Sequence, residues 1–209
     1  MRIIEKLVEA YKSRLPDFDE FMNEGASYSE IDHLIESVDQ ELPASYVELL
    51  YNYNGEKTIL NTMGGYSLLS LEQVEMQWRL FSAKDRSIRP KEIFQEGKIQ
   101  PLLYHRNRIP FAHDGSGNFL CIDFYPDIKG EIGQIIYLPT GNLDPVSVIF
   151  KNFEEFVEFL IEALESSLFT FRDERRDWSQ EDWHMAEIYF YNTWRNDWVD
   201  LAESYNERN

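Results

Sequence analysis

The sequence predicts an α+β fold, because a group of strands stands between amphipathic helices. Residues 109–124 have the pattern of a strand, a glycine-rich turn and a second strand, and residues 134–138 have that of a third strand. The middle of the chain is therefore expected to be an antiparallel meander. After the turn, apolar residues occupy consecutive positions, which is typical of a strand covered on both faces.

The first helices are indicated by apolar stripes and caps. Residues 3–14 carry apolar side chains at helical spacing, and Leu15-Pro16 ends this helix. Residues 18–22 suggest one more short turn of helix. Ser27 and Glu30 form a capping box, which predicts a helix from there to about residue 40.

A third helix is expected to start at Leu42-Pro43, because proline suits a first helical turn. Asn54-Gly55 is interpreted as the left-handed stop of this helix, and a functional role of the pair is the alternative. A short strand at residues 66–69 precedes a second capping box, Ser70 to Gln73, which opens the next helix.

The second half of the chain alternates in the same way. Residues 84–108 carry seven basic and three acidic side chains without clear periodicity, so we interpret them as a loop or insertion. After the meander, a short strand is expected at residues 146–150. Asn152 then caps a helix with an apolar face that reaches Leu164.

The chain changes character at about Thr170. Residues 171–177 are interpreted as a charged link, and Ser179 as the cap of a last helix. Its expected apolar stripe consists of Trp183, Ala186, Phe190, Trp194, Trp198, Leu201 and Tyr205. This stripe is either a docking face for a partner or a face that packs on the domain. We favour packing on the domain.

Composition bounds the function. The chain has 209 residues, is 43% apolar and carries a formal charge of −18, which suits one large domain or a domain with an appendage. The charge argues against nucleic-acid binding and fits a basic protein partner, or simply a solvated acidic surface in the cytoplasm. We expect no signal peptide and no membrane-spanning segment. The single cysteine, Cys121, excludes a disulfide framework.

No motif points to an enzyme. Residues 114–118 resemble a calcium loop, but Phe119 stands where the loop needs glycine and Tyr125 where it needs glutamate. A turn closed by its own side chains is favoured. No nucleotide-binding or histidine-pair metal motif occurs. His113 beside Asp114 lacks a nucleophile signature, so we assign no catalytic residue, cofactor or metal, and keep an enzyme of unknown class as an alternative.

The order of the motifs resembles a known family. The first half runs from Leu42-Pro43-x-x-Tyr46 through Asn54-Gly55 to Tyr66-Ser67-Leu68 and a helix with Trp78. The second half comprises residues 109–124, Gly133-Gln134-Ile135-Ile136 and the helix that begins Phe153-Glu154-Glu155-Phe156. Over about residues 27–165 the chain resembles the SUKH superfamily, which comprises bacterial toxin-immunity proteins and fungal cell-wall-synthesis regulators of Smi/Knr type. The basic segment 84–108 is longer than the family pattern, and the tail after Thr170 has no counterpart in it.

The resemblance implies a twisted, mainly antiparallel central sheet with helices packed against it, to which the chain adds a C-terminal helical extension. We divide the chain into a helical leader (1–26), the SUKH-like α+β domain (27–168) and an acidic, tryptophan-rich extension packed on it (169–209). The resemblance also implies a non-catalytic, cytoplasmic protein-binding module. It would neutralise a toxin, with a basic toxin domain such as a nuclease as partner, or act as a regulatory scaffold. Candidate partner contacts are Asp114, Asp123, Trp78, Trp194 and Trp198, although the two aspartates suit a structural role equally well.

Overall fold

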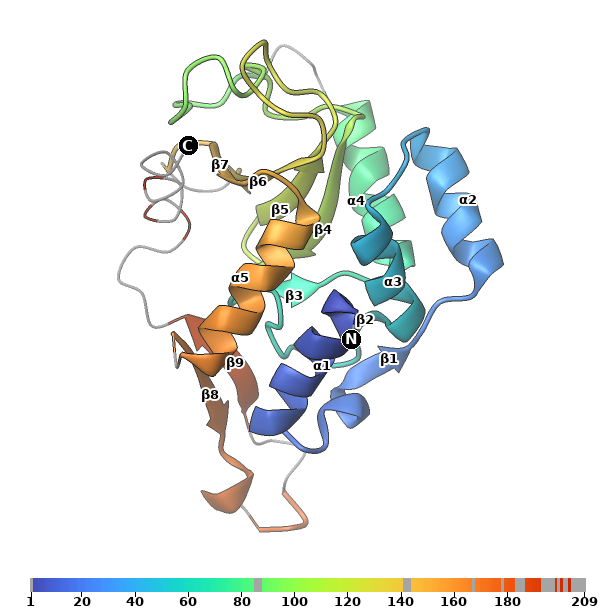
Figure 1. The fold of residues 1–209 in the computed structure, drawn as a ribbon, viewed down its shortest axis with the longest axis vertical. Coiled ribbons are helices and arrows are strands. Elements are labelled where there is room, and N and C mark those ends of the chain that lie inside the picture. The colour runs from blue at the N-terminus through green and yellow to red at the C-terminus, as the bar shows by residue number, and fades with distance from the viewer. Residues whose placement is uncertain are drawn as a thin grey trace.

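A central antiparallel sheet organises the protein. The computed structural model describes residues 2–84, 88–140, 144–166, 168–177, 179–182, 187–192, 198, 200 and 203. The sheet has the strand order β3-β4-β5-β6-β7, so the chain adds each strand beside the previous one (Figure 1). Its strands are β3 (Ser67–Leu68), β4 (Arg108–His113), β5 (Asn118–Asp123), β6 (Gln134–Pro139) and β7 (Ser147–Phe150). The α+β fold and the predicted meander are confirmed.

Helices cover this sheet as the apolar stripes predict. They are α1 (Ile3–Arg14), α2 (Tyr28–Val38), α3 (Ala44–Asn52), α4 (Leu71–Ala83) and α5 (Phe153–Glu165). Both predicted capping boxes are present: Ser27 accepts from the Glu30 N–H, and Ser70 accepts from the Gln73 N–H. The short turn of helix after α1 is the 3-10 helix Phe18–Phe21.

The two sides of β5 pack against two separate hydrophobic clusters. Leu120 and Ile122 belong to the main core, together with residues of α1, α3 and α5. Phe119 and Cys121 belong to the cluster on the opposite face. That second face is covered by Phe81 of α4 and by residues Ile99, Leu103 and Tyr104. The segment expected to be a loop or insertion therefore supplies the second cover of the sheet.

A small second sheet corrects the prediction for Asn54-Gly55. Helix α3 ends at Asn52, and Tyr53 is already extended. Asn54 and Gly55 lie inside β2 (Tyr53–Glu56), which pairs with β1 (Met22–Glu24). Gly55 does have the expected positive φ of 79°. The pair is not a helix C-cap, because pairing with β1 draws the chain into a strand directly after the helix.

The C-terminal extension begins with strands rather than with one long helix. Phe169–Asp173 forms β8 and Ile188–Asn192 forms β9, and the two pair antiparallel. The charged link and the uninterrupted helix over this region are therefore wrong. The run of β-branched and aromatic residues in β9 favours a strand, and Phe190 is buried while Tyr191 is 39% exposed. Trp198, Asp200 and Glu203 have helical backbone.

Contacts with α1 and α5 hold this extension against the domain, and β8 and β9 lie beside these helices in Figure 1. The Phe190 N–H donates to the Leu60 carbonyl at 2.8 Å, and the Phe190 ring packs edge-on against Tyr11. Trp198 is 1% exposed and contacts Tyr66 and Phe156. Helix α1 itself belongs to the main core, so the N-terminal leader is an integral part of the packed structure.

Candidate functional site

The structure does not bring together the four predicted contact residues that it describes. Asp114 lies in the turn between β4 and β5, whereas Asp123 lies at the opposite end of β5 and is fully buried. Trp78 is half-buried, and its indole N–H donates to the Arg106 carbonyl at 2.6 Å. Trp198 is buried in the core. Trp194 lies outside the described residues.

Asp114 closes its own turn. Its carboxylate accepts hydrogen bonds from the backbone N–H groups of Ser116 (2.8 Å) and Asn118 (3.0 Å) and from the side chains of the same two residues. Burial raises the pKa of Asp114, but these hydrogen bonds outweigh it and hold the pKa below its usual range. The turn closed by its own side chains, predicted in place of a calcium loop, is thus what the structure shows.

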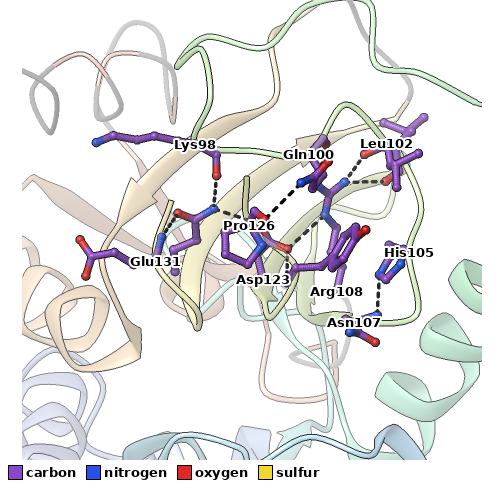
Figure 2. Close-up of polar contacts among 12 residues, drawn as sticks. Lys98, Gln100, Leu102, His105, Asn107, Arg108, Asp123, Pro126 and Glu131 are labelled. Atoms are coloured by element: carbon purple, nitrogen blue, oxygen red, sulfur yellow. Dashed lines mark hydrogen bonds and ion pairs between the residues drawn. The ribbon is translucent and has the colours of Figure 1, made fainter. Parts of the chain in front are cut away.

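Asp123 belongs to an interior polar network, shown in Figure 2. The Arg108 Nε lies 3.3 Å from Asp123 Oδ1, and both side chains are 0% exposed. The Gln134 amide donates to Asp123 Oδ2 at 3.0 Å, and the Tyr125 N–H donates to Asp123 Oδ1 at 3.1 Å. A buried charge is tolerated when it is paired and hydrogen-bonded in this way. The carboxylate of Asp123 is therefore not exposed to a partner.

The network fastens the basic segment to the sheet. Arg108 donates to the backbone carbonyls of Gln100 (3.0 Å) and Leu102, and the Gln134 amide donates to the Lys98 carbonyl at 3.0 Å (Figure 2). These bonds join the loop that covers the second face to β4 and β6. Sequence analysis left Asp123 as either a partner contact or a structural residue. Its buried carboxylate, bonded within this network, has the structural role.

A groove between α2 and α4 is the candidate binding feature. The two helices lie side by side on the right of the molecule in Figure 1, and the groove between them has a volume of about 530 Å³. Its lining residues come from α2, from the start of α4 and from the small β1–β2 sheet. They are Asn23, Ser29, Glu30, His33, Leu34, Asn54, Ser70, Leu71, Glu72 and Glu75.

Asn54 lines this groove, and Asn54 and Gly55 hold β2 against the start of α4. The Asn54 side-chain oxygen accepts from the Leu71 N–H at 2.7 Å, which ties β2 to the first turn of α4. The Asn23 amide donates to the Asn54 carbonyl at 3.0 Å. A Cβ on Gly55 would stand 2.4 Å from the Ser70 nitrogen, so only glycine allows this approach. The Asn-Gly pair positions α4 relative to the small sheet.

The lining of the groove is negative, because it contains Glu30, Glu72 and Glu75 and neither lysine nor arginine. Residues 15–78 contain thirteen acidic side chains and one basic side chain, Lys57. Glu30 and Glu72 come from the two walls of the groove and are exposed. Hydrogen bonds from the Ser27 side chain and backbone lower the pKa of Glu30, so this carboxylate stays ionised at neutral pH. The arrangement favours a positively charged ligand.

Among the described residues, no group of three or more His, Cys, Asp or Glu side chains is arranged to hold a metal ion. Within the same residues, no helix is both long and apolar enough to cross a membrane. Burial raises the pKa of the Cys121 thiol, which keeps it protonated at neutral pH.

The fold defines the class of protein: an α+β domain with a five-stranded antiparallel meander, a helical main core on one face, and the end of α4 with residues 99–104 on the other. Residues 25–158 match the family described as SMI1 / KNR4 family (SUKH-1), and the chain belongs to this family. The resemblance noted in the sequence is thereby confirmed.

Two curated fungal proteins are similar to parts of the chain. The "Cell wall biosynthesis/cell cycle regulator smi1" of Schizosaccharomyces pombe is 26% identical over 159 residues, which cover 68% of this chain and 31% of that protein. The "KNR4/SMI1 homolog 2" of Debaryomyces hansenii is 38% identical over 85 residues, which cover 41% of this chain and 13% of that protein. The chain thus spans a third or less of the length of these relatives.

Sequence reasoning missed the groove although it identified most of its parts. The two capping boxes and the Asn54-Gly55 pair were each assigned to a local role. The available signal was the run of thirteen acidic residues against one basic residue across the segment that contains all three motifs. That contrast is stronger than the average charge of the chain, and it marks the segment that forms the groove.

Proposed function

We propose that this chain is a non-catalytic module that binds a basic protein. The observation that carries the proposal is the acidic lining of a groove framed by two capped helices. The groove lies in a segment, residues 15–78, that has thirteen acidic side chains and one basic side chain. A negative surface of this kind accelerates encounter with a positively charged partner and repels acidic competitors. Membership of the SMI1/KNR4 family supports a protein partner.

The first form of the proposal is immunity. In this form the chain binds a basic toxin domain, such as a nuclease, in the cytoplasm of the producing cell and covers the surface that would contact the phosphate backbone. An acidic surface suits this task because it competes with a polyanionic substrate. Co-expression with each toxin encoded beside its gene tests the idea. Restored growth, with the toxin co-purifying, is expected, and failure with every such toxin would contradict it.

The second form is regulation of cell-wall synthesis or of signalling. It is favoured by the names of the two similar fungal proteins, of which one is called a cell wall biosynthesis and cell cycle regulator. In this form the acidic surface binds a component of the host's own machinery. Cross-linking in the native host, followed by mass spectrometry of the purified complex, distinguishes the forms. A host regulatory protein is expected here, and a secreted toxin domain in the immunity form.

The absence of catalysis is part of the proposal. The His113 ring nitrogen accepts from the Gly115 N–H at 3.1 Å, and the Asp114 carboxylate accepts its bonds from Ser116 and Asn118. Both side chains are thus engaged in closing the turn. None of these hydrogen bonds joins Asp114 to His113 or orients the imidazole as a general base. Hydrolase and nuclease assays are expected to show no activity. An activity that is lost in His113→Ala would overturn this part.

A further inference from the structure

We propose that the groove between α2 and α4, together with the adjoining outer surface of α4, binds a positively charged amphipathic helix of the partner protein. The inference rests on the proposed function, because it assumes that the chain binds a protein. It goes further by assigning the surface and the chemistry of the segment that occupies it.

The shape of this surface is the first argument. Beside the groove of about 530 Å³ lies a second hollow of about 720 Å³, which runs along α4. Glu72 and Glu75 line both hollows, so the two adjoin along one wall. Together they form an elongated depression that follows the first three turns of α4. A depression beside and between two helices is suited to a third helix, with a diameter of roughly 10 Å.

Exposed apolar side chains are the second argument. Met76 is 50% exposed and Leu80 is 49% exposed, although both are large apolar residues. They are four positions apart on α4 and therefore lie on the same face, one turn from each other. Both line the second hollow. Methionine adapts its shape to different partners, and burying both side chains would strengthen binding through the hydrophobic effect.

Charge decides which helix fits. Glu30 of α2 and Glu72 and Glu75 of α4 line the depression. Arg79 of α4 also lines it and carries a positive charge. The Arg79 guanidinium pairs with Glu75 at 2.6 Å, so these two charges offset each other and Glu30 and Glu72 supply the net negative charge. The remaining negative charge calls for lysine or arginine on the occupant. The complementary segment is a helix with an apolar strip for Met76 and Leu80, flanked by basic side chains.

Rigidity is the third argument. Both walls begin with a capping box, and the start of α4 is held to β2 by the Asn54 side chain and by the close approach at Gly55. A preformed surface loses little conformational entropy on binding, so its contacts contribute more fully to affinity.

A defined probe tests the assignment. The probe is a fluorescently labelled synthetic peptide with leucines at helical spacing and lysines around them, and its counterpart has the same composition in an order that gives no apolar strip. Fluorescence anisotropy with the full chain measures binding, and amide chemical shifts map the site. We expect the amphipathic peptide to bind at least about tenfold more tightly than the scrambled one, with shifts confined to α2 and α4. Equal binding of the two peptides would show that only non-specific electrostatic attraction holds them, and it would overturn the inference.

Paired variants locate the surface. Glu72→Lys/Glu75→Lys should weaken the peptide complex by about tenfold or more, because two basic side chains replace two acidic ones in the depression. Its control is Glu154→Lys/Glu158→Lys on α5, which makes the same change in charge, also starting in the first turn of a helix. Met76→Ser/Leu80→Ser should weaken binding by a similar factor. Its control is Ile128→Ser/Ile132→Ser, since these side chains are 92% and 78% exposed elsewhere.

The same variants separate this inference from the proposed function. In the growth-rescue or co-purification assay, loss of the partner with the α4 variants and retention with both controls supports surface and function together. Retention of the partner by the α4 variants leaves the protein-binding function standing and shows that the surface is wrong. If the unaltered chain captures no protein, the proposed function fails. The amide chemical-shift changes caused by the peptide then show separately whether α2 and α4 form the binding surface.

Discussion

Gly64 lies against the six-membered ring of the Trp198 indole. A Cβ built on Gly64 would stand 2.7 Å from Cη2 of Trp198, and Gly64 has a positive φ of 65°. The glycine therefore provides the space in which a residue of the C-terminal extension is buried, 134 positions further along the chain. The β2–β3 connection and the C-terminal extension therefore pack closely against each other at Gly64 and Trp198.

Gly64→Ala is expected to detach Trp198 and destabilise the protein. Positive φ alone costs an alanine about 1–2 kcal/mol, and the clash with the indole adds about 1–3 kcal/mol. Gly133→Ala is the control, because Gly133 has a φ of 86° but has no atom within 4 Å of the added Cβ. Urea denaturation should show the larger loss for Gly64→Ala, and limited proteolysis near Arg175-Arg176 should be faster. Equal losses in the two variants would mean that the indole does not press on this position.

Glu56 should be essential for the loop that follows β2. Its carboxylate accepts hydrogen bonds from the N–H groups of Leu60, Asn61, Thr62 and Leu68, at 2.7 to 3.0 Å. Glu56→Gln replaces one accepting oxygen by a donor that faces N–H groups, so the free energy of unfolding should fall by about 2–4 kcal/mol. The exposed change Glu20→Gln is the control and should have little effect. A Glu56→Gln protein with an unchanged urea midpoint would contradict this prediction.

The ion pair of Arg108 and Asp123 should be strongly coupled. Arg108→Met leaves a buried carboxylate without its cation, and Asp123→Leu leaves a buried guanidinium without its anion, so each should cost about 3–5 kcal/mol. The double variant should lose clearly less than the sum of the single losses, because neither charge is then left unpaired. Urea denaturation of all four proteins measures the coupling. Additive losses would show that the pair contributes through packing alone.

Acid should weaken the attachment of the extension to the N-terminal helices. Hydrogen bonds from Arg175 lower the pKa of Asp17 and of Asp173 below their ordinary value of 3.8. Because the folded-state pKa is depressed, the stability from this cluster is present above the ordinary pKa and is lost as pH falls through the folded value. The difference in unfolding free energy between the unaltered chain and Arg175→Ala should be constant near neutral pH and should shrink below about pH 4. A difference that grows in acid would contradict the assignment.

Local patterns predicted most of the elements. The capping boxes at Ser27 and Ser70, the double-sided apolar run of β5 and the turn at Asp114 are each specified by a few neighbouring residues. The long helix predicted across β9 failed because aromatic residues in Ile188–Asn192 fit helical spacing and strand alternation alike. Pairing with β8 selects the strand, and that partner lies about twenty residues away.

The candidate site was less predictable than the fold. Asp114 and Asp123 were both candidate contacts because they belong to the family motif at residues 109–124, yet one closes a turn and the other is buried beside Arg108. The groove depends on Asn23, Asn54 and Leu71, which are brought together only when β1, β2 and α4 meet. Hydrogen bonds between residues so far apart produce no periodic pattern in the amino-acid sequence.

The amino-acid sequence by itself determined the helices with their caps, the meander, the acidic charge and the family, because each depends on residues near one another or on composition. Only the tertiary structure decided that the basic segment covers the second face of the sheet, that the C-terminal extension begins as a hairpin, and that α2 and α4 enclose an acidic groove. The physical reason is that these features arise from contacts between distant segments. Such contacts form only when the whole chain has buried its apolar surface.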